Sequence, residues 1–210
     1  MFITLEGPEG SGKTSQMASL AEFLSQGNQE VVTTREPGGT PISDQIREII
    51  MKMDNTSMHP RTEVLLFLAA RAQLVEQVIR PALMAGKIVI CDRYVDSTLA
   101  YQGYGHGNDL DELRRLLNFT TGGLKPDVTL LLDIDVNDGM RRKQSGGSEW
   151  NRMDAYTSAF HQRVRQGYLS LAQAEPERWV VIDASQSPAV VQISLREALG
   201  ALVSKSRKPV

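Results

Sequence analysis

Five short apolar runs divide the chain into longer segments of mixed polarity. Within each run the β-branched and apolar side chains are nearly continuous and do not alternate with polar ones. Continuous runs of this length are typical of strands whose two faces are both buried in a parallel sheet. We therefore predict five strands, at residues 2–5, 31–34, 88–91, 128–132 and 179–182.

The segments between these runs carry the three- and four-residue spacing of amphipathic helices. This spacing predicts helices at residues 14–25 and 42–53, and a longer helix at 62–85 that Pro81 kinks or interrupts. Strands that alternate with helices are joined by right-handed crossovers and form a parallel sheet covered on both faces. The pattern therefore predicts a three-layer α/β domain.

Length, charge and cysteine content narrow the functional classes. A chain of 210 residues fits one domain with a sizeable core. Its 23 Lys and Arg against 25 Asp and Glu leave a net charge of −2, so we expect no nucleic-acid partner and no membrane partner. The single cysteine, Cys91, excludes an intramolecular disulfide, and no apolar run is long enough to span a membrane. We expect a soluble, cytoplasmic protein.

Residues 7–14, GPEGSGKT, match the pattern GxxxxGK[ST] between a predicted strand and a predicted helix. The glycines let successive backbone N–H groups point at a phosphate, and the helix adds the positive end of its dipole. Lys13 supplies a charge for the β- and γ-phosphates, and the Thr14 hydroxyl can ligate Mg²⁺. The candidate residues for binding a nucleoside triphosphate are Gly7, Pro8, Glu9, Gly10, Ser11, Gly12, Lys13 and Thr14.

Motifs elsewhere in the chain decide which kind of P-loop protein this is. The NKxD and DxxG segments of guanine-nucleotide switches are absent from the sequence. Residues 141–153, RRKQSGGSEWNRM, form a basic, glycine-containing segment, which favours a mobile cationic flap; the alternative is a solvated connection between helices. A small P-loop domain with such a flap is suited to phosphoryl transfer onto a second small molecule.

A second group of residues could form a pocket for that molecule. Arg35 ends the second predicted strand and Arg93 follows the third, at the sheet edge where ligands bind. Phe67 and Arg71 are four residues apart on a predicted helix, so one face offers an aromatic ring and a guanidinium together. The alternative is a core phenylalanine beside a surface arginine. Hydroxyl, phenol and amide groups follow Arg93, at Ser97, Thr98, Tyr101 and Gln102.

GPEGSGKT, TREPGGT (34–40), FLAARAQ (67–73), DRYVDSTLAYQG (92–103) and the basic segment together resemble thymidylate kinases in order and spacing. The resemblance extends from residue 2 to about residue 187. It implies the P-loop nucleoside-monophosphate-kinase fold, with a five-stranded parallel sheet flanked by helices. It also implies ATP-dependent phosphorylation of dTMP to dTDP in dTTP biosynthesis. We expect one kinase domain over residues 1–210, a mobile basic lid at about 140–153, and a homodimer formed through the helices around 62–82.

The resemblance also implies roles for single residues of the acceptor site. Phe67 stacks on thymine, Arg71 and Thr98 read its edge, and Arg35 and Arg93 hold the acceptor phosphate. Either Tyr101 or Gln102 closes the sugar side, and Glu9 approaches the sugar 3′-hydroxyl and the metal region. The full set implied for dTMP is Glu9, Arg35, Pro37, Phe67, Arg71, Arg93, Ser97, Thr98, Tyr101 and Gln102.

One departure from the family concerns the charge on the transferred phosphoryl group. Some thymidylate kinases carry an arginine inside the P-loop, but here the variable positions are Pro8, Glu9, Gly10 and Ser11. We therefore expect the bacterial-type arrangement, in which lid arginines supply this charge. The catalytic candidates are Lys13, Arg93, Arg142, Arg141 and Arg152, with Arg142 as the first choice of the lid. Thr14 and Asp92 are the candidates for holding Mg²⁺, and Asp154 stands where the family has an acidic residue.

Two alternatives remain open at this point. A kinase for a different small acceptor, such as another nucleoside monophosphate or a deoxynucleoside, would differ in acceptor preference. A P-loop ATPase linked to nucleic acid would bind oligonucleotides in a strongly salt-dependent way. The near-neutral overall charge and the residues of the second pocket favour the kinase for dTMP.

Overall fold

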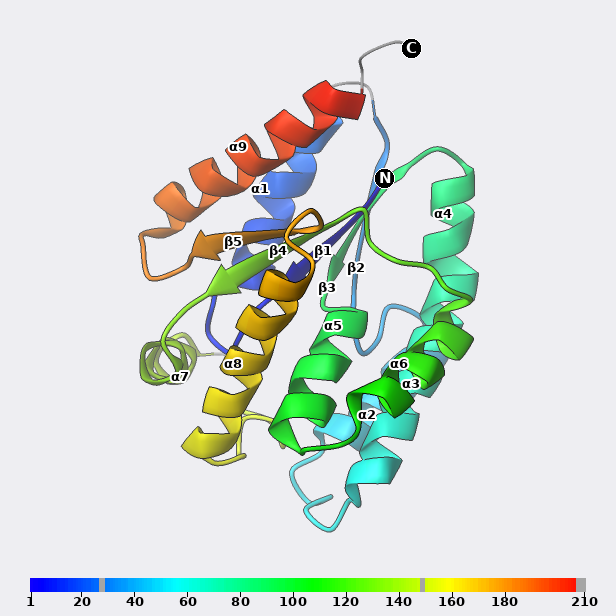
Figure 1. The fold of residues 1–210 in the computed structure, drawn as a ribbon, viewed down its shortest axis with the longest axis vertical. Helices are drawn as coiled ribbons and strands as arrows, with labels where there is room; N and C mark the ends of the chain where they lie inside the picture. Colours follow the sequence, from blue (N-terminus) through cyan, green and yellow to red (C-terminus); the bar gives the residue numbers. More distant parts are fainter. Residues whose placement is uncertain (27–28, 148–149, 207–210) are drawn as a thin grey trace.

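The computed structural model describes residues 1–26, 29–147 and 150–206. Five parallel strands form one sheet in the order β2-β3-β1-β4-β5 (Figure 1). They are β1 (Phe2–Glu6), β2 (Val31–Arg35), β3 (Ile88–Asp92), β4 (Val128–Asp133) and β5 (Trp179–Asp183). All five predicted strands are confirmed, and each ends one residue later than the apolar run that predicts it.

Helices cover both faces of the sheet, which confirms the predicted three-layer α/β fold (Figure 1). They are α1 (Lys13–Ser25), α2 (Pro41–Met51), α3 (Pro60–Leu74), α4 (Arg80–Met84), α5 (Val95–Thr98), α6 (Leu110–Thr121), α7 (Val136–Ser145), α8 (Ser158–Ala174) and α9 (Pro188–Ser206). Two π-helical segments, η1 (Val75–Ile79) and η2 (Leu99–Gly105), continue α3 and α5. The predicted interruption of the long helix is confirmed, because η1 lies directly ahead of Pro81, which has no N–H to donate.

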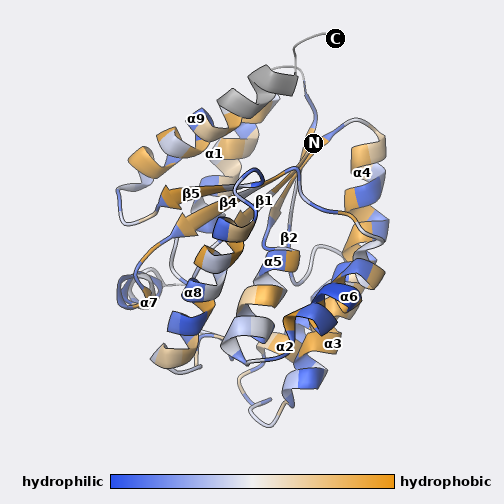
Figure 2. Ribbon diagram, viewed as in Figure 1, coloured by the Kyte–Doolittle hydropathy of each residue, from blue (hydrophilic) through white to orange (hydrophobic). Residues whose placement is uncertain are grey.

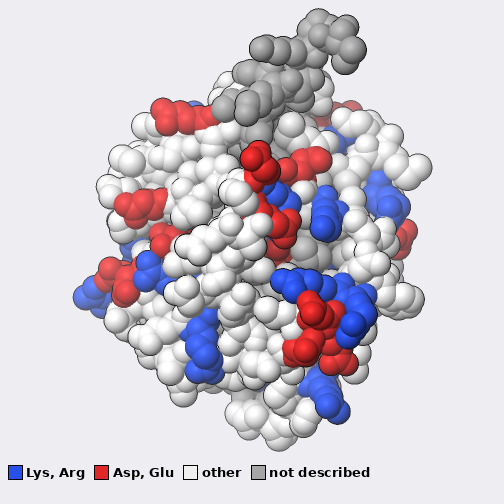
Figure 3. All heavy atoms as spheres, viewed as in Figure 1, with Lys and Arg blue, Asp and Glu red and all other residues white. Residues whose placement is uncertain are grey.

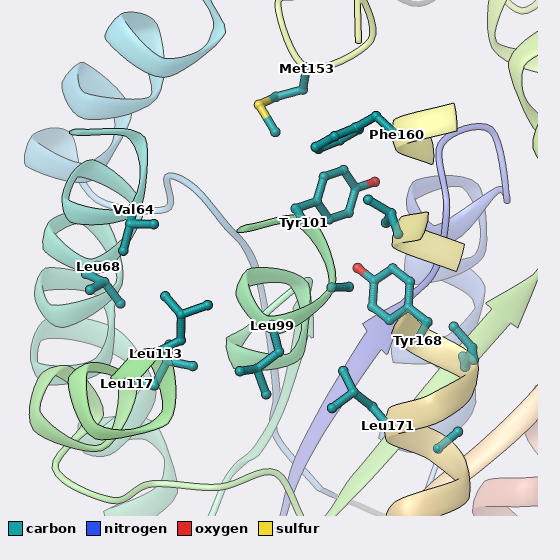
Figure 4. Close-up of a cluster of buried hydrophobic side chains, with 14 of the residues drawn as sticks. Val64, Leu68, Leu99, Tyr101, Leu113, Leu117, Met153, Phe160, Tyr168 and Leu171 are labelled. Carbon is teal, nitrogen blue, oxygen red and sulfur yellow. The ribbon is translucent and has the colours of Figure 1, made fainter. Parts of the chain in front are cut away.

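Among the described residues, clusters of buried apolar side chains form a layer on each face of the sheet. The alternation of a strand divides its side chains between the layers, so Ile3 and Leu5 of β1 pack with α1 and α9, whereas Phe2 packs with η1 and α4. Figure 2 shows the strands as predominantly hydrophobic and α7 as strongly hydrophilic. A third cluster joins α3, α6, α8 and η2, and Figure 4 shows Tyr101 of η2 beside Phe160 and Tyr168 of α8. Tyr101, which belongs to the group of residues predicted to form the second pocket, is therefore packed into the core through these aromatic contacts.

The last residue of every strand is polar: Glu6, Arg35, Asp92, Asp133 and Asp183. Because the strands are parallel, these residues all lie at the same edge of the sheet. Among the described helices, none has the length and apolar character needed to cross a lipid bilayer. On the face shown in Figure 3, positive and negative side chains are interspersed rather than gathered by sign. The sheet edge is therefore the place to look for a site.

Candidate active site

A cavity of about 1000 Å³ opens at the carboxyl edge of the sheet. One part of it, the P-loop end, is lined by Gly10, Gly12, Lys13, Thr14, Ser15, Arg142 and residues 185–188. The other part, the Arg71 end, is lined by Arg35, Glu36, Pro37, Phe67, Arg71, Ser97, Thr98, Tyr101 and Gln102. Glu9, Asp92 and Arg93 line the cavity between the two. Residues predicted from two separate motif groups therefore meet in one space.

The P-loop is shaped by close backbone contact with α7. Gly10 has φ of +71°, and a Cβ there would lie 1.8 Å from the carbonyl oxygen of Gly139. A Cβ on Gly139 would in turn lie 2.3 Å from the carbonyl oxygen of Glu9. Both positions therefore require glycine, and this contact fixes the loop against the helix that carries the lid arginine Arg142.

The Lys13 side chain lies inside the P-loop. Its Nζ donates to the carbonyl oxygens of Gly7 and Pro8, both at 2.9 Å, and to Ser11 Oγ at 3.1 Å. Burial and the nearby Arg93 charge lower the pKa of Lys13 to about 8, against the opposing effect of Glu9. Gly7, Pro8 and Ser11 do not line the cavity but hold the lysine that does. The structure thus gives these predicted residues a supporting position.

The two residues predicted to hold Mg²⁺ are in contact. Thr14 Oγ1 donates to Asp92 Oδ2 at 2.9 Å, and Asp92 Oδ1 is a buried oxygen with no hydrogen-bond partner among the described residues. Hydroxyl and carboxylate oxygens are the ligands that Mg²⁺ prefers. No group of three His, Cys, Asp or Glu in the described chain could enclose a metal by itself. The geometry fits an ion that takes its other ligands from water and nucleotide phosphates.

Arg93 connects the two ends of the cavity. Its backbone has φ of +69°, a left-handed conformation that is rare for a residue with a side chain. The guanidinium donates to the Gly7 carbonyl at 3.1 Å, to Tyr168 Oη at 3.0 Å and to Glu9 Oε1 at 2.8 Å. It also lies 5.0 Å from the centre of the Tyr101 ring. The protein thereby holds this charge in one position.

Glu9 is surrounded by cationic side chains. Besides Arg93, it accepts from Tyr101 Oη at 2.9 Å and from Lys143 Nζ at 3.3 Å. Burial alone would raise the pKa of Glu9, but Arg93, Lys13 and Lys143 together hold it well below its ordinary value. Glu9 is therefore ionised at neutral pH and lies where the two ends of the cavity meet.

Arg71 is buried, with 1% of its surface exposed, yet it lines the cavity. Its Nε donates to Glu36 Oε2 at 2.7 Å, its Nη1 to Thr98 Oγ1 at 2.9 Å and its Nη2 to the Tyr94 carbonyl at 2.9 Å. Phe67, one turn earlier on α3, lines the same cavity and packs its other side against the core. The alternative of a core phenylalanine beside a surface arginine is therefore wrong.

The remaining predicted residues of the Arg71 end differ in how firmly they are held. Ser97 Oγ donates to Glu6 Oε2 at 2.6 Å, and Gln102 Nε2 donates to Glu63 Oε1 at 2.8 Å. Arg35 lies at the mouth with 59% of its side chain exposed, 3.5 Å from Asp44. Pro37, which follows a cis peptide bond, also lines the cavity.

The three lid arginines lie in three different environments. Arg142, in the last turn of α7, lines the cavity and donates to the carbonyl oxygens of Ala184 at 2.6 Å and Ser185 at 2.7 Å. Arg141 is 77% exposed and pairs with Asp138. Arg152 is buried and donates to Glu63 Oε2. Within the described residues, Arg142 is thus the lid arginine that reaches the cavity; residues 148 and 149 of the predicted lid lie outside the description.

Sequence reasoning missed several residues that build the site. Lys143 lines the cavity and contacts Glu9 and Asp154, the latter at 2.5 Å. Glu6 is fully buried and accepts from the Tyr94 N–H at 2.8 Å and from Tyr168 Oη at 2.9 Å, as well as from Ser97. Burial and the nearby Asp96 raise the pKa of Glu6 to about 7, despite the opposing charge of Arg93. The position of Glu6 at the polar end of a predicted strand is the one signal that could have found it.

Comparisons with known proteins agree on one family. The family model for thymidylate kinase matches residues 5–195. The thymidylate kinase of Roseiflexus sp. (strain RS-1) is 51% identical over 214 residues, which covers 97% of this chain and 93% of that protein. The thymidylate kinase of Geotalea uraniireducens (strain Rf4) is 46% identical and covers 94% and 95% of the two chains. A crystal structure of thymidylate kinase from Ehrlichia chaffeensis is 36% identical, with a TM-score of 0.76 over 95% of this chain and 98% of that one.

Proposed function

The chain belongs to the thymidylate kinase family, and from this premise we propose how its cavity performs the family reaction. It is an ATP-dependent nucleoside monophosphate kinase, which transfers the γ-phosphoryl group of ATP to dTMP and gives dTDP and ADP. One observation carries the assignment of sites: a single cavity joins Lys13 of the P-loop to the Phe67 and Arg71 pair. ATP then binds at the P-loop end and dTMP at the Arg71 end.

The P-loop end suits the phosphates of ATP. The glycine-rich loop and the first turn of α1 offer backbone N–H groups for the β-phosphate, as residues of this motif are expected to do. Lys13, now bonded to loop carbonyls, is placed to exchange these partners for β- and γ-phosphate oxygens. Residues 185–188, at the N-terminal end of α9, line the same end and would contact the adenosine.

The Arg71 end suits a thymine nucleotide. The Phe67 ring provides a stacking surface for the base, while Arg71, Thr98 and Gln102 offer polar groups to its edge. Ser97 and Pro37 complete the wall of this end. The aromatic ring of Tyr101 lies against the site of the sugar, where a flat apolar surface accommodates a deoxyribose.

Phosphoryl transfer depends on position and charge rather than on a protein nucleophile. In this reaction a phosphate oxygen of dTMP forms a bond to the γ-phosphorus as the bond to the β–γ bridging oxygen of ATP breaks. Arg35 and Arg93 hold the acceptor phosphate, and Lys13, Arg93 and Arg142 offset the charge that spreads over the transferred group. Arg142 is favoured over Arg141 and Arg152 because its guanidinium already lies at the cavity. Ionised Glu9 orients Arg93 between the two substrates.

An ATP-using kinase requires a divalent cation, and we propose Mg²⁺ held by Thr14 and Asp92. When bound, the ion would neutralise phosphate charge and align the β- and γ-phosphates. The Thr14 hydroxyl and the unpartnered Asp92 Oδ1 support this assignment. Asp92 is the last residue of β3, next to the P-loop strand β1, so its position is fixed by the sheet.

We also propose a single kinase domain with a lid at about residues 140–153, and a homodimer. The last turn of α7 and the segment around Asn151 line the cavity, which supports a lid over the substrates. Large apolar side chains are exposed on α2 (Ile42, 53%; Ile49, 48%), α3 (Leu65, 60%) and α6 (Phe119, 85%). Burying them between two copies would stabilise a dimer through the helices around residues 62–82. Light scattering after size exclusion tests this: a mass near 23.2 kDa would contradict it.

A panel of acceptors tests the function directly. ADP release from Mg²⁺-ATP is measured with dTMP, dUMP, UMP, CMP, AMP, GMP and thymidine, with a reaction lacking acceptor as the control. The proposal expects strong turnover with dTMP and almost none without an acceptor. Turnover that is independent of acceptor would contradict the assignment of the Arg71 end to dTMP, although the P-loop assignment would stand.

A further inference from the structure

Gln102, at the Arg71 end of the cavity, is held from behind by a buried carboxylate that neither the motifs nor the reaction assigns. Glu63 of α3 is 1% exposed and does not line the cavity. Its Oε1 accepts from Gln102 Nε2 at 2.8 Å and lies 3.2 Å from His106 Nε2. Its Oε2 accepts from Arg152 Nη2 and, at 2.8 Å, from Tyr156 Oη. Each oxygen therefore has two neighbouring polar groups.

These contacts keep Glu63 in its ionised form. Burial alone would raise the pKa of Glu63, but the hydrogen bonds from His106, Gln102 and Arg152 and the Arg152 charge lower it to about 2. An ionised carboxylate has no proton to donate and can only accept hydrogen bonds. The amide of Gln102 must therefore present its NH₂ group to Glu63.

The amide orientation determines what Gln102 offers to a ligand. With Nε2 directed to Glu63, Oε1 is turned away from it, and among the described residues this oxygen has no hydrogen-bond partner in the protein. It is also not among the atoms sealed from solvent, and the residue lines the cavity. Gln102 thus presents an acceptor to the Arg71 end.

Arg71 presents the complementary group. Its Nη1 carries two hydrogens, and Thr98 Oγ1 accepts one of them. The Glu36 carboxylate and the Tyr94 carbonyl fix the rest of the guanidinium. A donor from Arg71 and an acceptor from Gln102 match a pyrimidine with a carbonyl beside a ring N–H. Cytosine has the reverse pattern, an amino group beside a bare ring nitrogen.

We propose that Glu63 is a specificity-determining positioning residue, which fixes the Gln102 amide so that the Arg71 end selects thymine over cytosine. This inference rests on the proposed binding of the base at that end. Glu63 acts through Gln102 and does not touch the substrate. Its contacts with Arg152 and Tyr156 also join the base pocket to the end of the lid and to the chain that follows it.

The test compares kcat/KM for dTMP and dCMP in the wild type and in Glu63→Gln, which replaces the acceptor-only carboxylate with an amide. We expect the ratio of dTMP to dCMP to fall by about tenfold or more, which is the effect of one lost hydrogen bond or one mispaired group. The loss should arise in KM for dTMP, with kcat changed less. Dissociation constants for both nucleotides are measured by calorimetry beside turnover. A failure of phosphoryl transfer, which would count against the proposed function, then leaves the test of Glu63 intact.

Two further variants separate positioning from stability. Tyr156→Phe removes a hydrogen bond from the same carboxylate but leaves the Glu63–Gln102 contact, so its ratio should stay within about twofold of the wild type. Glu63→Asp keeps the negative charge near Arg152, but its shorter side chain withdraws the carboxylate from Gln102. If Glu63→Gln does not fold, the ratio of dTMP to dCMP in Glu63→Asp provides the test. A wild-type ratio in a folded Glu63 variant would overturn the proposal. An equal loss in Tyr156→Phe would also overturn it.

Discussion

The P-loop end and the Arg71 end of the cavity are built in different ways. At the P-loop end, half of the lining residues come from one short stretch, residues 10–15, and Lys13 is held by carbonyls of the residues just ahead of it, Gly7 and Pro8. At the Arg71 end they come from β2, α3, α5 and η2, and buried carboxylates hold them in place. Glu36, which itself lines the cavity, holds Arg71, whereas Glu6 lies behind Ser97 and Glu63 behind Gln102.

This difference predicts different consequences of mutation. A local loop can lose a ligand-binding side chain without losing the fold, because its shape depends on backbone contacts such as Gly10 against Gly139. A site held by buried ion pairs loses stability when such a side chain is removed, because the partner charge stays buried and uncompensated. Substitutions at the P-loop end should therefore affect catalysis, whereas those at the Arg71 end should affect stability and binding together.

Lys13→Met should produce the largest change in rate. Loss of the charge at the β- and γ-phosphates is expected to lower kcat by about a thousandfold, while the dissociation constant for dTMP stays close to that of the wild type. Steady-state kinetics and calorimetry with dTMP measure the two quantities. Lys87→Met, which removes a surface lysine paired with Glu30, is the matched control. A weakened dTMP affinity in Lys13→Met would mean that the two ends are not separable.

Arg71→Met should produce the largest change in stability. It leaves Glu36, whose side chain is 3% exposed, without its ion-pair partner. We expect a loss of about 3–5 kcal/mol in the free energy of unfolding, measured by urea denaturation. The double variant Glu36→Gln/Arg71→Met should recover part of this free energy. KM for dTMP should be raised in both variants, because both lack the Arg71 guanidinium. Equal stability of Arg71→Met and the wild type would contradict the comparison.

Arg142→Ala should lower kcat by about a hundredfold with little change in KM for dTMP, because its charge is needed most in the transition state. The adjacent Arg141→Ala should cost less than about tenfold in kcat, since its side chain is 77% exposed and paired with Asp138. Both variants are compared by steady-state kinetics at saturating ATP and dTMP. A larger loss of kcat in Arg141→Ala than in Arg142→Ala would show that Arg142 is not the arginine that supplies the lid charge.

Glu6 should make stability depend on pH in a direction opposite to an ordinary ion-paired carboxylate. Its pKa is raised from 4.5 to about 7 in the folded state, so the folded protein binds the proton more tightly than the unfolded chain. The stability that Glu6 contributes is therefore present below pH 4.5 and is lost as the pH rises to about 7, by at most about 3 kcal/mol.

Urea denaturation between pH 5 and pH 8 measures this effect as the difference between the wild type and Glu6→Gln. The amide cannot ionise, so the variant should gain stability relative to the wild type as the pH rises. Glu48→Gln, at an exposed position on α2, serves as the control and should follow the wild type in parallel. Parallel profiles for Glu6→Gln as well would show that Glu6 does not titrate in this range.

The difference between a locally built P-loop end and an Arg71 end assembled from distant elements also explains how much could be predicted from the sequence. Strands, helices and P-loop follow from local patterns, and each strand is right to within one residue. Phe67, Arg71 and Gln102 were found because they occur in family motifs. Glu63 lies just ahead of one such motif, but its role depends on contacts with Gln102 and Arg152, which are 39 and 89 residues away.

The lid shows the limit most clearly. Its arginines are close in sequence, but Arg141 points to solvent, Arg142 to the cavity and Arg152 to α3. The direction of each side chain depends on its angle around α7 or on the buried partner that it contacts. The amino-acid composition of the lid predicts neither of these. Lys143 was overlooked for the same reason, since its place beside Glu9 follows from the packing of α7 against the P-loop.

The Phe67 side of the Arg71 end should recognise dTMP independently of the P-loop. Calorimetric titration of Phe67→Leu with dTMP, and separately with a non-hydrolysable ATP analogue, measures this independence. Leucine keeps an apolar side chain but removes the stacking ring, so dTMP affinity should fall about tenfold while affinity for the ATP analogue stays within about twofold. Unchanged dTMP affinity, or an equal loss for both nucleotides, would show that Phe67 does not recognise the base of dTMP separately from the ATP site.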